Sequence, residues 1–214
     1  MNAPPVIRFL DRTTPPHIST LILLAGLSAM VMNIFLPSLP YMAEYFGTDY
    51  AVMQLSVPLF LFCSGILQLF IGPISDNLGR RKVMMGGLVL FIGATLGCIY
   101  APNATVFLIF RIGQAIIATA MVLSRAVIRD LYSQDQSASM MGYVTMGVAL
   151  VPMISPAIGG AIEQVFDWTV TFWLMAVLGG VILLIVWADM GETARHSGKT
   201  LIGQFREYPE LLRA

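Results

Sequence analysis

The chain consists mainly of long apolar runs that contain no Asp, Glu, Lys or Arg. Residues 18–43 and 50–75 form two such runs of 26 residues each, and residues 83–110 form a third of 28 residues. A helix needs about 20 apolar residues to cross the roughly 30 Å hydrocarbon layer of a membrane. Membrane-spanning β-strands alternate polar and apolar positions instead, which these runs do not do. The pattern therefore predicts membrane-spanning helices.

The apolar runs are interrupted by short polar segments, and these interruptions divide them into six predicted helices. The third run contains Pro102 and Asn103, and proline interrupts a helix because it lacks a backbone N–H. One helix therefore ends near Tyr100, and the next begins near Ala104. The predicted spans are 18–43, 50–75, 83–100, 104–128, 136–162 and 168–188.

This division implies an all-α membrane protein with three parts. A short N-terminal segment (residues 1–17) precedes the six-helix bundle (residues 18–189), and a polar tail follows it (residues 190–214). The first segment holds four prolines and two arginines and lacks a short apolar core, so we expect no cleaved signal peptide. The tail shows a weak amphipathic pattern, which predicts a helix on the membrane surface or in water.

Basic residues predict the orientation of the bundle. Eleven of the twelve Lys and Arg residues fall on one side of the six spans, and the loops on the other side (45–49, 101–103 and 163–167) contain none. Cytoplasmic loops carry an excess of Lys and Arg, so both termini are predicted to be cytoplasmic. The eleven residues are Arg8, Arg12, Arg80, Arg81, Lys82, Arg125, Arg129, Arg195, Lys199, Arg206 and Arg213.

Composition excludes several classes of protein. Hydrophobic residues make up 57% of the chain and charged residues only 11%, compared with about 25% charged in soluble domains. With so few charged residues the chain is not expected to present a basic face to nucleic acid, and the balance of twelve basic and twelve acidic residues adds nothing to this. Cys63 and Cys98 lie inside apolar runs and are predicted to be free thiols. The lipid bilayer is therefore the expected partner.

The segment between the second and third spans combines glycine, acidic and basic residues. Gly72 allows another helix to approach closely. Gly79 permits a positive φ, which a tight reversal of the chain requires. Asp76 can pair with a following arginine or cap a helix N-terminus, although a plain positive loop would also explain the basic triplet. The residues of this pattern are Gly72, Asp76, Gly79, Arg80, Arg81 and Lys82.

The first and fourth spans contain polar residues that need partners. Arg111 lies about six residues into the fourth span, roughly 9 Å deep. A charge at this depth is costly unless it is paired or hydrated. Arg111 therefore faces a central cavity, bonds carbonyl groups of a neighbouring helix, or extends toward the membrane surface. For Asn33 and Gln114, cavity lining and hydrogen bonds between helices are equally consistent with the sequence.

The fifth span contains two prolines and a glycine pair. Pro152 and Pro156 remove backbone hydrogen bonds and should bend the helix. Gly159 and Gly160 allow close packing beyond the bend. This arrangement predicts either a gating hinge or a merely kinked helix.

These motifs together resemble the major facilitator superfamily. Its signature between the second and third helices has the form G-x-x-x-D-x-x-G-R-[RK]-[RK], which the segment from Gly72 to Lys82 matches with the same spacing. The resemblance implies a gate on the cytoplasmic side that helps to set the inward/outward equilibrium. Arg111 and Gln114 are similar to the R-x-x-Q-G motif of the fourth helix, with Ala115 in place of glycine.

Two other segments resemble the bicyclomycin/chloramphenicol-resistance branch of this superfamily. In the fifth span, Pro156, Gly159 and Gly160 match the exporter motif G-P-x-x-G-G, with serine in place of its first glycine. In the first span, residues 33–40 resemble D-x-Y-L-P-x-L-P, with Asn33 in place of aspartate and Phe35 in place of tyrosine. Because asparagine does not titrate, proton coupling would have to use another group.

The resemblance implies a secondary active transporter in the plasma membrane, which is the inner membrane in bacteria. The six spans correspond to the N-terminal half of a bundle built from 3+3 inverted repeats, with the substrate cavity between two halves. The expected partners are therefore a second six-helix half or a second copy, and a small amphiphilic or drug-like substrate. Asn33, Phe35, Arg111 and Gln114 would line the substrate or proton pathway. An ion gradient, of protons by this resemblance, would drive export without a bound cofactor.

The sequence lacks the residues that an enzyme within the membrane would need. An enzyme within the membrane needs a catalytic set, but His17 and His196 both lie outside the spans and no nucleophile or metal motif occurs. No enzymatic activity and no metal site are therefore predicted. A metabolite or sugar transporter of the same superfamily, or a non-transporting six-helix protein that oligomerises, stays open.

Overall fold

The structure is a computed structural model that describes residues 7–192. Within this range all regular secondary structure is helical, and six helical stretches are long and apolar enough to cross a membrane. The prediction of an all-α bundle with six spans is confirmed. The spans are Ile18–Tyr45, Tyr50–Leu78, Arg80–Ile99, Ala104–Leu131, Gln134–Val165 and Trp168–Asp189. The predicted helix in the tail lies outside the described residues.

Several spans are divided into shorter helical elements. The first contains α1 (Ile18–Asn33), a 3₁₀ turn η1 (Leu36–Ser38) and α2 (Leu39–Tyr45), and the second contains α3 (Tyr50–Gln54) and α4 (Ser56–Leu78). The remaining elements are α5 (Arg80–Ile99), α6 (Ala104–Gly113), the 3₁₀ segment η2 (Gln114–Ile117), α7 (Ala118–Leu131), α8 (Gln134–Val165) and α9 (Trp168–Asp189).

Polar residues set the points where helices begin. The Asn103 side chain accepts a hydrogen bond from the backbone N–H of Val106 at 2.9 Å, and Asp49 accepts one from Ala51 at 3.1 Å. Such side chains satisfy the N–H groups that lack partners in the first turn of a helix. The predicted break at Pro102-Asn103 is therefore confirmed, with a physical cause.

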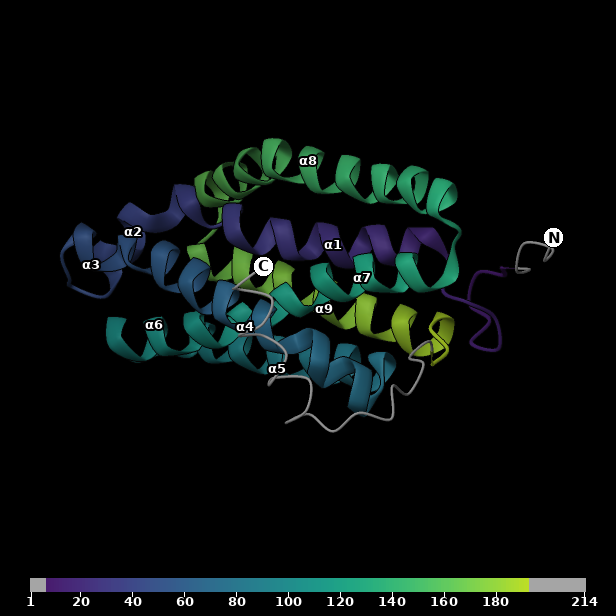
Figure 1. Ribbon diagram of the computed structural model, residues 1–214. Coiled ribbons are helices and arrows are strands. Elements are labelled where there is room, and N and C mark those ends of the chain that lie inside the picture. The colour runs from purple at the N-terminus through teal and green to yellow at the C-terminus, as the bar shows by residue number, and fades with distance from the viewer. Residues whose placement is uncertain (1–6, 193–214) are drawn as a thin grey trace, which may run out of the picture.

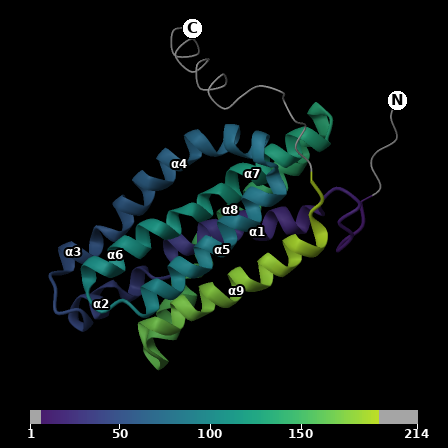
Figure 2. The same cartoon turned by 90° about the horizontal axis from the view of Figure 1, so that it is seen from below.

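The helices form a bundle with α1 at its centre. α1 packs against α8 on one side and against α7 and α9 on the other, whereas α5 packs against α6 and α9 (Figures 1 and 2). α4 and α8 are the least buried of the long helices. Figure 1 shows α8 as an arc, which agrees with the bend predicted from Pro152 and Pro156 inside it.

Several helices extend beyond the predicted boundaries, including the first and fourth spans, which end at Tyr45 and Leu131. The expected loop between the second and third spans is reduced to Gly79, because α4 continues to Leu78 and α5 begins at Arg80. Gly79 has φ +96°, a conformation that side chains with a Cβ rarely adopt, so glycine allows this abrupt reversal. α8 begins and ends beyond the predicted span, at Gln134 and Val165.

A buried carboxylate connects the N-terminal segment to the last helix. Asp189, at the end of α9, is fully buried and accepts hydrogen bonds from the backbone N–H of Leu10 (2.7 Å) and of His17 (2.9 Å). It also accepts one from the Thr20 hydroxyl at 2.6 Å. These bonds hold the start of α1 against the end of α9, a role that the sequence did not predict.

Candidate functional site

The first candidate site lies at the end of the bundle where α4, α7 and α9 end and α5 begins. This end is called the basic end. The Arg80 side chain is only 5% exposed, and its Nη2 lies 3.2 Å from Asp76 Oδ1 and 2.8 Å from Asp130 Oδ2. The two carboxylates come from α4 and α7, whereas Arg80 begins α5. One guanidinium therefore joins three helices.

Two further contacts connect this cluster to α9. The backbone N–H of Arg80 donates to Glu192 Oε1 at 2.8 Å, so a carboxylate lies at the N-terminus of α5, where the helix dipole favours negative charge. Arg81 Nη2 donates to the Trp187 carbonyl oxygen at 2.9 Å. The basic end thus holds four helices in one relative arrangement.

The six residues of the predicted gating motif do not all act as expected. Asp76, Gly79, Arg80 and Arg81 take part in the contacts above, and Lys82 is exposed. Gly72 was expected to allow the close approach of another helix. That expectation is wrong within this chain, because a Cβ added at Gly72 would meet no atom within 4 Å. Gly72 lines a cavity instead.

Replacing Asp130 with asparagine should loosen the basic end more than the same change at Asp76. Asp130 makes the shorter contact with Arg80 and is the less exposed carboxylate, 22% against 37%. Hydrogen–deuterium exchange of the peptide 76–83 should become about tenfold faster in Asp130→Asn and about two- to threefold faster in Asp76→Asn. Asp135→Asn, at an exposed acid on α8, is the matched control. Equal exchange in all three variants would contradict this order.

The second candidate site is a buried polar cluster around Arg111. Arg111 is 0% exposed, and its Nη1 donates to Gln114 Oε1 at 2.7 Å. Its Nη2 donates to the Val31 carbonyl oxygen at 2.9 Å. Gln114 Nε2 continues the chain of bonds to Thr95 Oγ1 at 2.8 Å. The cluster therefore joins α1, α5 and the fourth span.

The partner of Arg111 on α1 has a physical explanation. Val31 is one of the last four residues of α1, whose carbonyl groups have no full set of partners within the helix. A cation at this end also interacts favourably with the helix dipole. The rings of Phe35 and Phe60 lie over the guanidinium, with centroids 4.0 and 4.6 Å away. Arg111 is thus enclosed by polar and aromatic partners.

These contacts decide the alternatives left open by the sequence. Of the three alternatives for Arg111, the structure shows the second, because the guanidinium bonds a carbonyl oxygen of a neighbouring helix. Amide and aromatic groups of the same bundle enclose the rest of it. Gln114 bonds between helices, whereas Asn33 is half-buried and donates to Ala29 O of its own helix at 2.8 Å. Phe35 is fully buried against Arg111 and Phe172.

The glycine pair of α8 divides into two different positions. A Cβ added at Gly159 would overlap the carbonyl oxygen of Ile34, the residue that ends α1. A Cβ at Gly160 would only touch Pro37, at 3.8 Å. The predicted close packing is therefore confirmed, and Gly159 is the residue that requires it.

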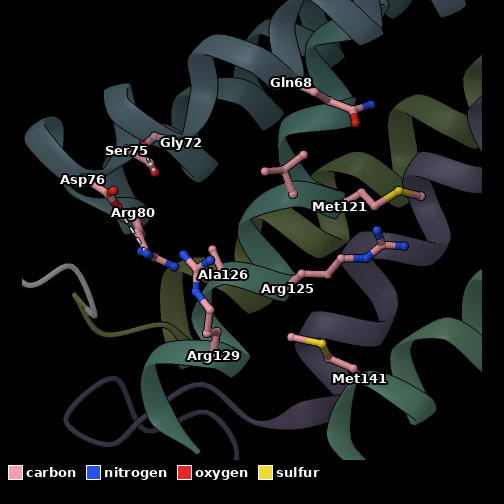
Figure 3. A pocket seen from close by; sticks show the side chains of 11 residues that line it. Gln68, Gly72, Ser75, Asp76, Arg80, Met121, Arg125, Ala126, Arg129 and Met141 are labelled. Atoms are coloured by element: carbon pink, nitrogen blue, oxygen red, sulfur yellow. Dashed lines mark hydrogen bonds and ion pairs between the residues drawn. The ribbon is translucent and has the colours of Figure 1, made fainter. Parts of the chain in front are cut away.

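A cavity opens beside the Arg80 cluster (Figure 3). It measures about 360 Å³ and lies between α4, α7 and the first turns of α8. Its lining includes Asp76 and Arg80 together with two arginines of α7, Arg125 and Arg129. Nothing in the sequence reasoning had separated these two arginines from the other basic residues that set orientation.

Asp130, Glu192 and Arg125 are the site residues that the sequence did not identify. Asp130 and Glu192 are close in sequence to helix ends, where a charged residue is ordinary, and Arg125 was counted only among the basic residues that predict orientation. Their roles depend on contacts between residues far apart in the chain, such as Arg80 and Glu192. Among residues 7–192, no group of three or more His, Cys, Asp or Glu could hold a metal ion. Cys63 and Cys98 are free thiols, as the sequence predicted.

Comparison with known proteins identifies the family. Residues 21–211 match the Major Facilitator Superfamily, and the chain belongs to that superfamily. A chloramphenicol resistance protein of Pseudomonas aeruginosa is 34% identical over 148 residues, which cover 68% of this chain and 35% of that protein. A bicyclomycin resistance protein homolog of Haemophilus influenzae is 29% identical over 192 residues, or 88% of this chain and 48% of that protein. The resemblance to this branch is confirmed.

A solved structure supports the fold. The peptide transporter POT, crystallised with sulfate, superposes on 94% of this chain with a TM-score of 0.74 at 14% identity, and the match covers 44% of that transporter. The chain is therefore a multi-pass membrane protein with the six-helix architecture of this superfamily. It spans between about a third and a half of the length of the curated relatives described above.

Proposed function

We propose that this chain forms one half of a secondary active transporter that exports small amphiphilic or drug-like molecules. The similarity to the chloramphenicol and bicyclomycin resistance proteins is the observation that carries this proposal. The charged contacts of Arg80 support it, because they fix the relative arrangement of the helices that carry the gating motif. The named family and relatives are transporters, which argues against an enzymatic role.

The membrane and the orientation follow from charge. Arg12 of the N-terminal segment, the Arg80 cluster and the two arginines of α7 lie at the basic end. We place this end in the cytoplasm of a bacterium and the bundle in the inner membrane, because basic loops are retained on the cytoplasmic side.

A second six-helix unit would complete the cavity. α4 and α8 expose large apolar side chains that nothing in the described part of the chain covers, including Phe62 (69% exposed) and Met153 (76% exposed). We propose that part of this surface contacts the other half of the transporter or a second copy, and that the rest contacts lipid.

Proton coupling would not use the Asn33 position. Asn33 bonds the Ala29 carbonyl oxygen and has no proton to release. The carboxylates near Arg80 are the alternative, since ion pairs that break during gating can exchange protons. Replacing Asn33 with aspartate should therefore leave the pH dependence of transport unchanged. A shifted profile would place this position on the proton pathway.

Efflux from cells tests the proposed function. Bacteria that lack their main exporters and express this protein in its native full-length form should accumulate less ethidium and tolerate more chloramphenicol than cells with the empty vector. Collapse of the proton gradient with a protonophore should abolish both differences. Equal accumulation in both strains, at confirmed expression in the membrane, would contradict drug export.

A further inference from the structure

Five arginines lie within the spans of this bundle, and only Arg80, Arg81 and Arg111 have partners in the described part of the chain. Arg80 contacts two carboxylates, and Arg111 contacts an amide, a carbonyl oxygen and two aromatic rings. Arg125 and Arg129 differ from these. Both are exposed, and neither forms a hydrogen bond or ion pair with any residue of the described part of the chain.

Arg125 also lies deeper than a surface residue. It precedes Leu131, the end of α7, by six residues, which places it about 9 Å from that end. An unpaired charge at this depth is costly in hydrocarbon and requires water or an opposite charge. The cavity beside Arg80 supplies the space, and Arg125 is part of its lining.

The Arg125 side chain points in a different direction from the other arginines of the cavity. In Figure 3, Arg129 points toward Arg80, whereas Arg125 extends the other way, between Met121 and Met141. Methionine side chains are flexible and polarizable, so they adapt to apolar groups of different shapes. A cationic head beside two methionines is suited to a ligand that carries an anionic group on an apolar body.

The charge balance of the cavity favours the same ligand. Its lining contains three arginines, Arg80, Arg125 and Arg129, but only one carboxylate, Asp76. Asp130 is not part of the lining, and its carboxylate already forms an ion pair with Arg80. The surplus of positive charge in a recess attracts anions.

We propose that Arg125 is the anion-binding residue of the transport cavity, and that it selects substrates with a carboxylate or similar oxyanion next to an apolar body. This proposal rests on the proposed export function and adds a substrate class to it. The guanidinium offers a planar pair of N–H donors, which match the two oxygens of such a group. The phosphate of an anionic lipid presents the same chemistry, so the test must distinguish the two sources.

Binding of two dyes with one scaffold tests the proposal. The protein is inserted into nanodiscs of phosphatidylcholine, and the fluorescence polarisation of fluorescein, an anion, and of rhodamine 6G, a cation, is measured. The Kd for fluorescein should rise at least about tenfold in Arg125→Gln and less in Arg125→Lys. The Kd for rhodamine 6G should not rise. Arg8→Gln removes the same charge from an exposed position outside the cavity and is the matched control.

Three results would overturn the proposal. The first is the absence of saturable fluorescein binding, and the second is an equal Kd for fluorescein in Arg125→Gln and Arg8→Gln. The third is displacement of fluorescein by phosphatidylglycerol in the discs, with native mass spectrometry showing that Arg125→Gln loses bound phosphatidylglycerol, which would assign Arg125 to a lipid headgroup. Saturable binding of rhodamine 6G in any of these cases would leave the proposed export function standing.

Discussion

Replacing Arg111 with methionine should lower the melting temperature of the detergent-solubilised protein by roughly 10 °C. The change leaves the Val31 carbonyl oxygen and the Gln114 amide oxygen without their donor in a fully buried place. Loss of these bonds should cost about 3 kcal/mol, because buried polar groups without partners are expensive. For a domain of this size, each kcal/mol shifts the melting temperature by roughly 2–4 °C.

Two other variants test whether the loss of stability comes from the buried hydrogen bonds of Arg111. Arg111→Lys keeps the positive charge but lacks the planar pair of donors, so its melting temperature should lie between those of the wild type and Arg111→Met. Arg129→Met removes an exposed arginine that has no partner in the described residues, and it should melt close to the wild type. Equal melting of Arg111→Met and Arg129→Met would mean that the buried cluster does not stabilise the bundle.

The second large effect is expected at Gly159. Replacing it with alanine places a methyl group on the carbonyl oxygen of Ile34, so α8 must move away from the end of α1. Backbone atoms cannot yield as a flexible side chain does, and a forced shift of this kind costs about 1–3 kcal/mol or more. The melting temperature and the amount of folded protein in the membrane should therefore both fall.

Gly160 is the matched control for this substitution. Gly160→Ala adds the same methyl group to the same helix, but its nearest neighbour, Pro37, lies at an ordinary contact distance of 3.8 Å. Its melting temperature should stay close to that of the wild type. If Gly159→Ala does not accumulate, a fluorescent protein fused to the C-terminus reports the membrane-inserted fraction of each variant. Equal behaviour of the two variants would show that α1 and α8 do not approach closely at Gly159.

The sequence identified many residues of the candidate sites, but it did not identify the contacts that these residues make. The sequence left open whether Asp76 pairs with a following arginine or caps a helix, and the structure contains the ion pair with Arg80. The stronger contact, to Asp130, could not be predicted because it joins α5 to α7, 50 residues further along the chain. Likewise, an arginine inside an apolar span indicates that a partner exists, but the sequence does not say that the partner is Val31.

The sequence by itself determined the number of spans, their approximate ends and their class. These properties depend on local chemistry: the bilayer requires about 20 apolar residues for each crossing, and Asn103 and Gly79 interrupt the helices where they stand. Only the tertiary structure decided that Arg111 is enclosed while Arg125 lies open in a cavity. Both are arginines within the fourth span, and what separates them is the packing of α1, α4 and α8 around it, which brings together groups from distant parts of the chain.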